Sequence, residues 1–452
     1  MAETTAILES SDHAGADRPS PDLYRACVHC GLCLQSCPTY RVLGLEMDSP
    51  RGRIRQIMLV DTGELEIGSS FVTHIDRCLD CRACETACPS GVQYGKIVER
   101  ARAQIEHHYR RPLLARVGRR YAYATLADYA RLARNARWLR FYQRSGLQKL
   151  ARSSGVLKLL RLAEVEALAP AVEDDFFFRY IGETFPAEAE RRARVAFLAG
   201  CIASVSFAEL NRATIRVLQR NGVEVSVPRG QGCCGALHAH AGLRDDARKL
   251  ARRNIDVMLD DHFDAIVTNA AGCGSTLKEY GDLLESDPAY RERAHRFADK
   301  VKDVTEFLAE LGLRVPEAKL PARVTYQDPC HLAHGQRIRS APRELLRAAA
   351  AEFVEMPHSD QCCGSAGVYN VVENQLSMQI LAAKMNDVAS THAQILATAN
   401  VGCMLQLRAG VRQRGLNMEV RHVIELLDAA YASAAATHED AHPPTSDKPF
   451  HH

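Results

Sequence analysis

The chain has 452 residues, with 57 Lys and Arg against 55 Asp and Glu, and it contains 16 cysteines. This length allows two to four domains, and the nearly balanced charge argues against a nucleic-acid-binding protein. No apolar run of about eighteen residues predicts a transmembrane helix, and the polar first twenty residues hold no apolar core of a secretory signal. Sixteen cysteines without such a signal indicate a reducing compartment and metal ligation rather than disulfides. We therefore expect a cytoplasmic protein.

Eight cysteines form two copies of one spacing, C-x2-C-x2-C-x3-C-P. The copies are Cys27, Cys30, Cys33 and Cys37 before Pro38, and Cys78, Cys81, Cys84 and Cys88 before Pro89. This run binds [4Fe–4S] clusters in two-cluster ferredoxins, where the fourth cysteine ligates the other cluster. The spacing predicts a first cluster on Cys27, Cys30, Cys33 and Cys88, and a second on Cys78, Cys81, Cys84 and Cys37. The alternatives are a disulfide framework or zinc sites, which usually show C-x2-C pairs separated by a longer loop.

The segment between the two cysteine runs is predicted to be helical. Forty residues separate Cys37 from Cys78, more than a minimal ferredoxin needs. They include the sequence PRGRI at 50–54 and an apolar-periodic stretch through Ile57, Met58 and Val60. We therefore expect a mostly α-helical ferredoxin-type domain over residues 21–100.

The next segment is strongly basic. Residues 100–162 contain 16 Lys and Arg but only two acidic residues, Glu106 and Asp128. Arginines recur at every third position from Arg131 to Arg140 beside apolar residues such as Trp138, which predicts a basic amphipathic helix. Such a face suits an anionic membrane surface. It also suits an acidic partner subunit, or it is simply a solvated face.

The second half of the chain is an internal repeat with a period of about 129 residues. The strand-like segments VAFLAG and VTYQDP lead to Cys201 and Cys330, respectively. The interval from Cys201 to Cys233 is 32 positions, as is that from Cys330 to Cys362. The interval of 39 positions from Cys234 to Cys273 corresponds to one of 40 from Cys363 to Cys403. Two diverged copies are the simplest explanation.

Strands and helices alternate in both copies. Helices are predicted over 207–220 and 243–259 in the first copy, and over 342–352 and 374–388 in the second. This alternation is typical of an α/β unit with parallel strands. In each copy the cysteines lie where strands end, and in open α/β sheets ligands bind in that crevice.

Each copy contributes four cysteines, of which two are adjacent and precede a glycine. The first set is Cys201, Cys233, Cys234 and Cys273, and the second is Cys330, Cys362, Cys363 and Cys403. Glycine allows a tight turn close to a metal centre, where neighbouring amide groups would tune the redox potential. Three alternatives remain open: a further iron–sulfur centre in each copy, a scaffold that has lost its metal in one or both copies, or a redox disulfide or zinc site.

The histidines and the missing motifs add weaker evidence. His331 follows Cys330, and His238 and His240 follow the first Cys-Cys-Gly. Each of these histidines is a candidate ligand or proton relay. The alternative is an ordinary histidine of the core or the surface. His29 lies inside the first run and is expected to tune that cluster. The sequence has neither G-x-G-x-x-G nor G-x4-G-K-[ST], and no hydrolytic triad stands out. The chain is thus predicted to carry electrons but to lack the site that extracts them from a substrate.

The sequence predicts an α+β multidomain protein, in which a mostly α-helical ferredoxin domain precedes two repeated α/β Cys-Cys-Gly domains. The expected segments are a disordered N-terminus at 1–20, the ferredoxin-type domain at 21–100, a basic helical linker at 101–192, the two repeats at 193–315 and 320–432, and a disordered tail at 433–452.

A set of motifs carries a family resemblance over about residues 21–430. They are RACVHCG at 25–31, CPTY at 37–40, PRGRI at 50–54, DRCL at 76–79, CPSGV at 88–92, GCCGA at 232–236 and CCGSAG at 362–367. In this order they resemble the iron–sulfur subunit of bacterial glycolate oxidase (glycolate dehydrogenase). The combination is shared with the iron–sulfur subunits of lactate and glycerol-3-phosphate dehydrogenases and with heterodisulfide reductase subunits.

The resemblance implies a complex. Flavoprotein subunits that carry the FAD would oxidise glycolate to glyoxylate, and this chain would pass the electrons towards membrane quinone, which implies a place on the inner face of the cell membrane. The rival is a thiol–disulfide reductase acting at the adjacent cysteines, which needs an accessible thiolate of low pKa. In heterodisulfide reductase the last cysteine of each domain belongs to a C-x2-C pair, but Thr276 and Gln406 stand at the matching positions here. This departure argues against the five-cysteine cluster of that family.

Overall fold

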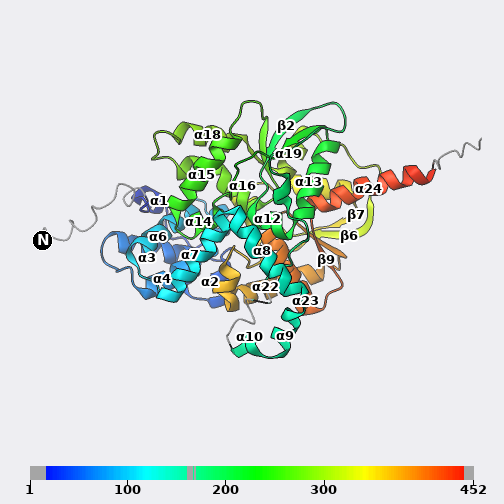
Figure 1. Ribbon diagram of the computed structural model, residues 1–452. Helices are drawn as coiled ribbons and strands as arrows, with labels where there is room; N and C mark the ends of the chain where they lie inside the picture. The colour runs from blue at the N-terminus through cyan, green and yellow to red at the C-terminus, as the bar shows by residue number, and fades with distance from the viewer. Residues whose placement is uncertain (1–16, 160–165, 167–168, 442–452) are drawn as a thin grey trace, which may run out of the picture.

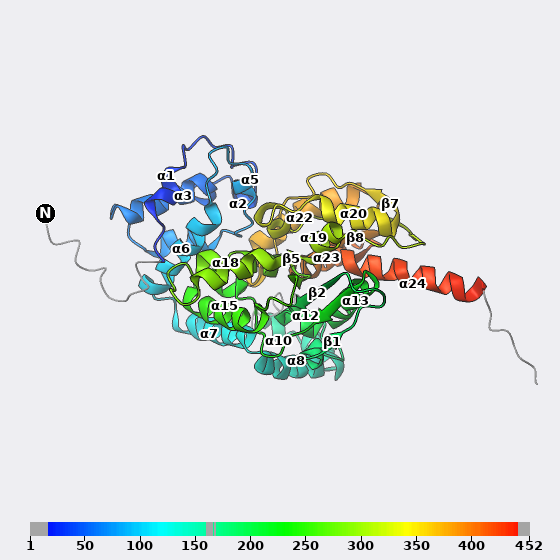
Figure 2. The ribbon, with the colours of Figure 1, turned by 90° about the horizontal axis from the view of Figure 1, so that it is seen from above.

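The computed structural model describes residues 17–159, 166 and 169–441. The N-terminal helices, the first repeat and the second repeat pack against one another, and the helices of the linker run along one face (Figures 1 and 2). This arrangement confirms the predicted α+β class of an α-helical domain followed by two α/β repeats. No helix in the described part of the chain is long and apolar enough to cross a membrane.

The N-terminal domain is helical throughout its described residues. Its helices are α1 (Pro21–Arg25), α2 (Pro38–Leu43), η1 (Glu46–Asp48), α3 (Pro50–Asp61), α4 (Ser69–Asp76), α5 (Ala83–Thr86) and α6 (Tyr94–His108). Three of them, α1, α2 and α3, begin at a proline directly after the N-cap residue, where the missing N–H of proline is not needed. The buried faces of α3, α4 and α6 form one hydrophobic core beneath the cysteine loops.

The boundary predicted after residue 100 falls inside a helix. Helix α6 continues to His108, and its residues Ala101 and Ile105 are fully buried in the core of the N-terminal domain. The apolar residues of α6 keep their helical spacing across residue 100. The boundary was predicted there because the chain becomes strongly basic after that residue.

The linker consists mainly of helices α7 (Leu113–Ala127), α8 (Tyr129–Arg144), α9 (Leu147–Ser153) and α10 (Val156–Leu159). Asp128 caps α8 by accepting hydrogen bonds from the amides of Ala130 and Arg131. The inner face of α8, with Leu132 and Ala136, packs into the core of the first repeat. The linker therefore rests on the first repeat. The short helix η2 (Phe177–Tyr180) and strand β1 (Thr184–Phe185), also within predicted linker residues, extend that repeat.

The first repeat contains a five-stranded sheet in the order β1-β3-β2-β4-β5, parallel except for the pairing of β1 with β3. Its remaining elements are β2 (Ala193–Phe197), α12 (Cys201–Ser206), α13 (Ala208–Arg220), β3 (Val223–Ser226), α14 (Ala236–His240), α15 (Arg244–Met258), β4 (Ala265–Thr268), α16 (Ala271–Lys278), α17 (Tyr280–Leu283), α18 (Arg291–Lys300), β5 (Val301–Asp303) and α19 (Val304–Leu311).

The second repeat contains a parallel four-stranded sheet in the order β7-β6-β8-β9. Its elements are β6 (Leu320–Tyr326), η3 (His331–Gly335), α20 (Ser340–Ala349), β7 (Ala350–Val354), α21 (Tyr369–Val372), α22 (Asn374–Ser390), β8 (Ile395–Thr398), α23 (Val401–Arg414), β9 (Glu419–His422) and α24 (Val423–Ala441). The strand order matches β3-β2-β4-β5 of the first repeat, so the duplication seen in the sequence is also a duplication of topology. The predicted helix over 342–352 ends earlier, at Ala349, because β7 begins at Ala350.

The two repeats share one hydrophobic core. The last helix of each packs on the first long helix of the other, α19 on α20 and α24 on α13. Buried residues from both copies, including Val304, Leu345 and Leu427, belong to the same cluster. The pair of repeats therefore forms one continuous support for the cysteine loops.

Some residues of both predicted disordered segments are ordered in the described part of the chain. Most of the predicted N-terminal segment lies outside the described residues, but Asp17 is buried against Arg244 and Arg248 of α15. The predicted tail from residue 433 begins within α24, which continues to Ala441, and residues 442–452 lie outside the described part.

Candidate iron–sulfur centres

The two cysteine runs fold into loops of the same backbone shape. The residues two and four positions after the first cysteine have positive φ in both: His29 at 55° and Gly31 at 85°, Asp80 at 52° and Arg82 at 61°. A left-handed conformation costs a non-glycine residue about 1 kcal/mol, and it persists where surrounding structure enforces it. Because each loop adopts this left-handed conformation twice, the first three cysteines of the loop point towards one another.

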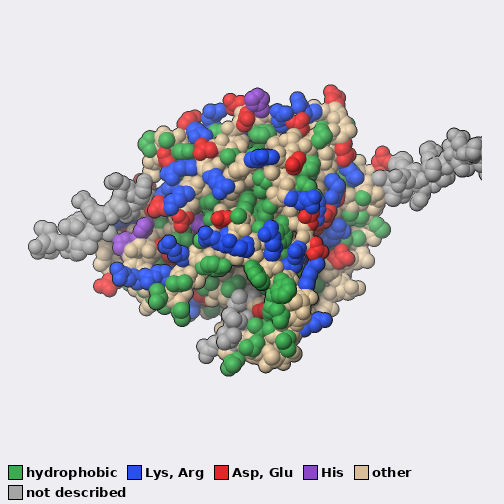
Figure 3. Space-filling model, viewed as in Figure 1, with side chains coloured by type: hydrophobic (Ala, Val, Ile, Leu, Met, Phe, Trp, Pro, Cys, Tyr) green, Lys and Arg blue, Asp and Glu red, His purple; other side chains and the backbone are tan. Residues whose placement is uncertain are grey.

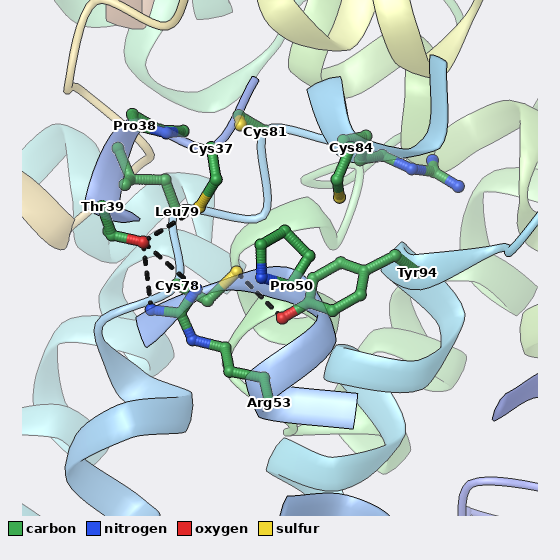
Figure 4. Close-up of a pocket in the computed structure, with 11 residues that line it drawn as sticks. Cys37, Pro38, Thr39, Pro50, Arg53, Cys78, Leu79, Cys81, Cys84 and Tyr94 are labelled. Atoms are coloured by element: carbon green, nitrogen blue, oxygen red, sulfur yellow. Dashed lines mark hydrogen bonds between the residues drawn. The ribbon is translucent and has the colours of Figure 1, made fainter. Parts of the chain in front are cut away.

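Each loop meets the fourth cysteine of the other loop across a cavity. The first cavity, with an empty volume of about 290 Å³, is lined by Cys27, Cys30, Cys33 and Cys88. The second, also of about 290 Å³, is lined by Cys37, Cys78, Cys81 and Cys84 (Figure 4). These are the two sets that the spacing predicts, including the exchange of the fourth cysteines. Four thiols around one cavity match the ligand set of a [4Fe–4S] cluster.

The two cavities differ in their exposure to solvent. Cys30 is exposed at the first cavity, and the neighbouring Val28 and Leu32 are 68% and 62% exposed. By contrast, Cys37, Cys78, Cys81 and Cys84 are all buried. The first cavity therefore opens to the surface, whereas the second lies inside the molecule.

Buried polar groups surround the second cavity. Tyr94 Oη donates to the Sγ of Cys78 at 3.7 Å, the amide of Asp80 donates to the same sulfur at 3.3 Å, and Thr39 Oγ1 lies 3.2 Å from the Sγ of Cys37 (Figure 4). Hydrogen bonds to cysteine sulfur tune the potential of a bound cluster. Burial raises the pKa of Cys84 well above its ordinary value. Metal binding would therefore require the thiol to lose a proton.

Arg53 is a buried positive charge at this cavity, which Arg82 also lines. Arg53 is 1% exposed and donates to the carbonyl of His74 at 2.7 Å and to Thr39 Oγ1 at 3.2 Å. It also pairs with the fully buried Asp48 at 3.4 Å. The sequence motifs PRGRI and CPTY include Arg53 and Thr39 but do not indicate their contacts, and no motif includes Tyr94. The position of Thr39, two residues after Cys37, was the one local signal.

In the first repeat, four cysteines meet where strands end. Cys201 follows β2, Cys233 and Cys234 follow β3, and Cys273 lies in α16 after β4. Their sulfurs lie in two close pairs, Cys201 and Cys233 at 3.9 Å, and Cys234 and Cys273 at 3.2 Å. The contact with Cys233, and then burial, raise the pKa of Cys201.

Side chains outside the motifs hold this loop in place. Asn254 Nδ2 donates to the carbonyl of Cys233 at 3.0 Å, and Tyr280 Oη donates to that of Cys234 at 2.8 Å. Tyr129 of α8 donates to the carbonyl of Gly232 at 2.7 Å. The linker thus contacts the loop that carries Cys233 and Cys234.

The second repeat brings its four cysteines together in the same way. Cys330 follows β6, Cys362 and Cys363 lie in the loop after β7, and Cys403 lies in α23 after β8. Cys362 contacts Cys330 and Cys363, and Cys363 contacts Cys403. The glycines after the adjacent pairs, Gly235 and Gly364, have φ of 83° and 89°. Both copies therefore use the tight turn that the sequence predicts.

The second set contacts both the ferredoxin-type domain and the first repeat. Cys81 and Cys362 belong to one buried cluster together with Leu79 and Tyr369. On the other side, Asn400 Nδ2 donates to the Sγ of Cys403 at 3.4 Å, and its Oδ1 accepts from the amide of Gly272, next to Cys273, at 3.4 Å. The second set therefore lies between the second cavity and the first set.

Buried thiols argue against exchange with a soluble disulfide. Cys233, Cys234, Cys362 and Cys363 are all buried, although contacts with Cys362 and then Cys403 lower the pKa of Cys363. The positions that depart from heterodisulfide reductase are also buried: Gln406 donates to Ser377 Oγ at 2.9 Å and accepts from Asn370 at 3.1 Å. Neither Gln406 nor Thr276 supplies a thiol, so each set consists of four cysteines.

The candidate histidines have different surroundings. His240 contacts Glu99 at 2.7 Å and Asp80 at 3.2 Å, and its ring stacks on His331 with centroids 5.0 Å apart. Burial would lower the pKa of His240, but the two carboxylates raise it to about 10. Burial and the charge of His240 lower the pKa of His331 to about 3.

The ligand atoms of Asp80, Glu99 and His240 lie within 4.8 Å of one another. Arg244 lies 3.6 Å from Glu99, and Arg102 donates to the carbonyl of His240 at 2.8 Å, so cationic side chains already surround this group. We interpret it as an ion-pair network that joins the ferredoxin-type domain to the first repeat. His238 packs against Tyr123 with ring centroids 5.3 Å apart, and His29 lines the first cavity.

Together, the fold and cysteine sets define a class of protein: a dicluster ferredoxin-type domain fused to two cysteine-rich domains. Family models agree with this assignment. A 4Fe-4S dicluster domain matches residues 24–92, and a cysteine-rich domain matches 195–278 and 324–408. A model of the glycolate oxidase iron-sulfur subunit linker region matches residues 114–169.

Whole-length relatives narrow the class to one family. A protein of Bacillus subtilis named probable glycolate oxidase iron-sulfur subunit is 42% identical over 410 residues, covering 89% of this chain and 92% of its own. The glycolate oxidase iron-sulfur subunit of Escherichia coli is 32% identical, covering 94% and 98%. Lactate utilization protein A of Bacillus subtilis is 29% identical over 52% of this chain. The chain belongs to the glycolate oxidase iron–sulfur subunit family.

Proposed function

We propose that this chain is the electron-transfer subunit of a glycolate dehydrogenase complex. Flavoprotein subunits of the complex bind FAD and oxidise glycolate to glyoxylate, and this chain conducts the resulting electrons towards a membrane quinone. The two cavities, each lined by four cysteines in the predicted sets, carry the proposal. A [4Fe–4S] cluster, when bound, takes up and releases one electron at a time.

The ligands we assign are Cys27, Cys30, Cys33 and Cys88 for one cluster, and Cys37, Cys78, Cys81 and Cys84 for the other. Exposure of Cys30 makes the first cavity the natural contact for a redox partner, because the second is buried. Val28 and Leu32 give that rim the apolar character of a protein interface core.

The arrangement of cysteines suggests an order of transfer. Electrons entering at the first cavity would pass to the second, and then across the contact between Cys81 and Cys362 to the second repeat. Asn400 forms hydrogen bonds with Cys403 of the second repeat and with Gly272 of the first repeat. Electrons would continue from the second repeat to the first across this contact. This order requires redox centres on the two Cys-Cys-Gly sets, which are the finer part of the proposal.

The first test is the iron and acid-labile sulfide content of the chain purified without air. About eight irons indicate two [4Fe–4S] clusters and metal-free repeats. More than eight, with the excess lost in Cys234→Ser and Cys363→Ser, indicates further centres in the repeats. Fewer than about four would reject the dicluster assignment.

The substrate is tested on the complex with its flavoprotein subunits. Glycolate should reduce a dye through the complex faster than lactate or glycerol 3-phosphate does, and Cys30→Ser should abolish that reduction while the flavoprotein subunits remain bound. A complex that prefers lactate or glycerol 3-phosphate would reassign the substrate. Reduction of a disulfide by the isolated chain would support the rival thiol–disulfide reductase.

A further inference from the structure

Large hydrophobic side chains are exposed together on helices α7 to α10. More than half of those exposed in the described residues lie on these four helices, among them Leu114 at 88%, Trp138 at 69%, Leu150 at 63% and Leu159 at 82%. Figure 3 shows hydrophobic side chains gathered over α9 and α10, below a row of Lys and Arg over α7 and α8. We call the outward faces of these helices the linker surface. Exposed apolar area of this kind marks an interaction site.

The helical spacing explains why these side chains face outward. Helix α8 buries Leu132 and Ala136 against the first repeat. Trp138 and Phe141, on the opposite side, are 69% and 56% exposed and contact each other edge to face with centroids 6.3 Å apart. The helix thus has one apolar face for the protein core and a second for something outside the chain.

Basic residues accompany the exposed apolar ones. Between residues 113 and 159, Asp128 is the sole acidic residue. Arg134 and Arg137 are exposed beside Trp138, as are Arg116 and Arg120 on α7, and none of these four arginines forms a salt bridge within the described residues. Bulky apolar side chains bordered by unpaired arginines match the chemistry of an interfacial helix on an anionic membrane.

We propose that the linker surface docks this chain on an anionic lipid surface. Trp138, Phe141 and the leucines of α9 and α10 enter the boundary between headgroups and acyl chains, and the arginines meet lipid phosphates. This proposal adds a docking surface to the proposed function. It rests on that function because a membrane quinone is the proposed electron acceptor. Tyr129 of α8 also bonds the carbonyl of Gly232, so docking through α8 would bring the first cysteine set close to the membrane.

Trp138 is the one tryptophan in the whole chain, so its fluorescence reports on the linker surface alone. The full-length protein, purified without air, is mixed with vesicles of phosphatidylglycerol and phosphatidylcholine, or of phosphatidylcholine alone. We expect a blue shift of Trp138 emission, quenching by brominated acyl chains and co-sedimentation with the anionic vesicles, all weakened by salt. Unchanged emission together with no co-sedimentation would overturn the proposal.

Variants separate docking from folding and electron transfer. The double change Arg134→Glu and Arg137→Glu should weaken vesicle binding at least tenfold, and Phe141→Ser should weaken it too, whereas Arg134→Lys with Arg137→Lys should retain it. Val315→Ser, at a residue that is 66% exposed outside the linker, is the control and should bind as the parent does. All variants should keep their iron content and their dye reduction with glycolate.

Two results would point elsewhere. If the Arg→Glu variant bound vesicles normally but lost the flavoprotein subunits, the linker surface would be a protein interface and the lipid proposal would fail. If vesicle binding behaved as expected but glycolate did not reduce the complex, the docking surface would stand and the proposed function would fall.

Discussion

Cys81 of the ferredoxin-type loop packs against Cys362 of the second repeat inside one buried cluster. The contact with Cys362, followed by burial, raises the pKa of Cys81 well above its ordinary value. The corresponding cysteine of the first repeat, Cys233, contacts Cys201 and Cys234, as Cys362 contacts Cys330 and Cys363, but no contact with a ferredoxin-type cysteine is found for Cys233 among the described residues. The two repeats therefore differ in how they meet the rest of the chain, although their own cysteines are arranged alike.

This asymmetry predicts unequal effects of the same substitution in the two repeats. Cys362→Ser should change the potential or the electron paramagnetic resonance signal of one of the two ferredoxin-type clusters, because it replaces the thiol beside Cys81. Cys233→Ser, at the matching position, should leave both signals unchanged. Equal effects of the two variants, measured by redox titration, would contradict a direct link through Cys362.

The exchange of fourth cysteines predicts which cluster each variant keeps. Cys37→Ala should lose the buried cluster and keep the exposed one, whose iron a chelator should extract quickly through the opening at Cys30. Cys88→Ala should keep the buried cluster, whose iron should be extracted more slowly. The time course of iron release in each variant checks this. The reverse order would mean that each run holds its own cluster.

Arg53 is predicted to be essential for the stability of the N-terminal domain. Arg53→Ala leaves the buried Asp48 with fewer charged partners and removes the hydrogen bonds to Thr39 and His74. Breaking a buried ion pair of this kind typically costs about 3–5 kcal/mol. Arg55→Ala, at an exposed position on the same helix, should cost less than about 0.5 kcal/mol. Thermal unfolding of both variants, compared with the parent, measures the difference.

His240 should make the interface between domains sensitive to alkaline pH. Because its pKa rises from 6.5 to about 10 on folding, the protonated ring stabilises the fold fully below pH 6.5, and this contribution is lost as the pH rises through about 10. The melting temperature of the parent should exceed that of His240→Gln at pH 6.5, and the gap should shrink by a few degrees towards pH 10. A gap that stayed constant with pH would exclude a charged His240.

Local patterns allowed much of the architecture to be predicted. The ferredoxin-type loops depend on cysteine spacings of a few residues, and the strands and helices of the repeats depend on short-range periodicity. The loops and the repeat elements could therefore both be predicted from the sequence. The repeat interval also predicted that two copies share one topology, and the matching strand orders confirm it. The domain boundary predicted after residue 100 falls inside helix α6, because the charge of the helix changes there whereas its buried face continues.

Contacts between distant segments were not predictable in this way. Asn400, Tyr129 and Arg53 form hydrogen bonds with the backbone of Gly272, Gly232 and His74, respectively, which lie far from them in the sequence, and no spacing rule links the partners. The meeting of Cys81 with Cys362 likewise results from how two domains pack. Sequence spacing therefore indicated which cysteines form a set, whereas the order of the sets required the structure.

Asp17 is buried where the described chain begins, and it pairs with Arg244 at 2.7 Å and with Arg248 at 2.9 Å in the first repeat. This clamp ties the beginning of the ferredoxin-type domain to α15, while α6 leads its other end into the linker. A carrier domain that swings on a tether between donor and acceptor would have to break these buried ion pairs in every cycle. For the electron transfer that we propose, this clamp therefore predicts a fixed conductor, in which the rate of transfer depends on set distances and not on the diffusion of a mobile arm.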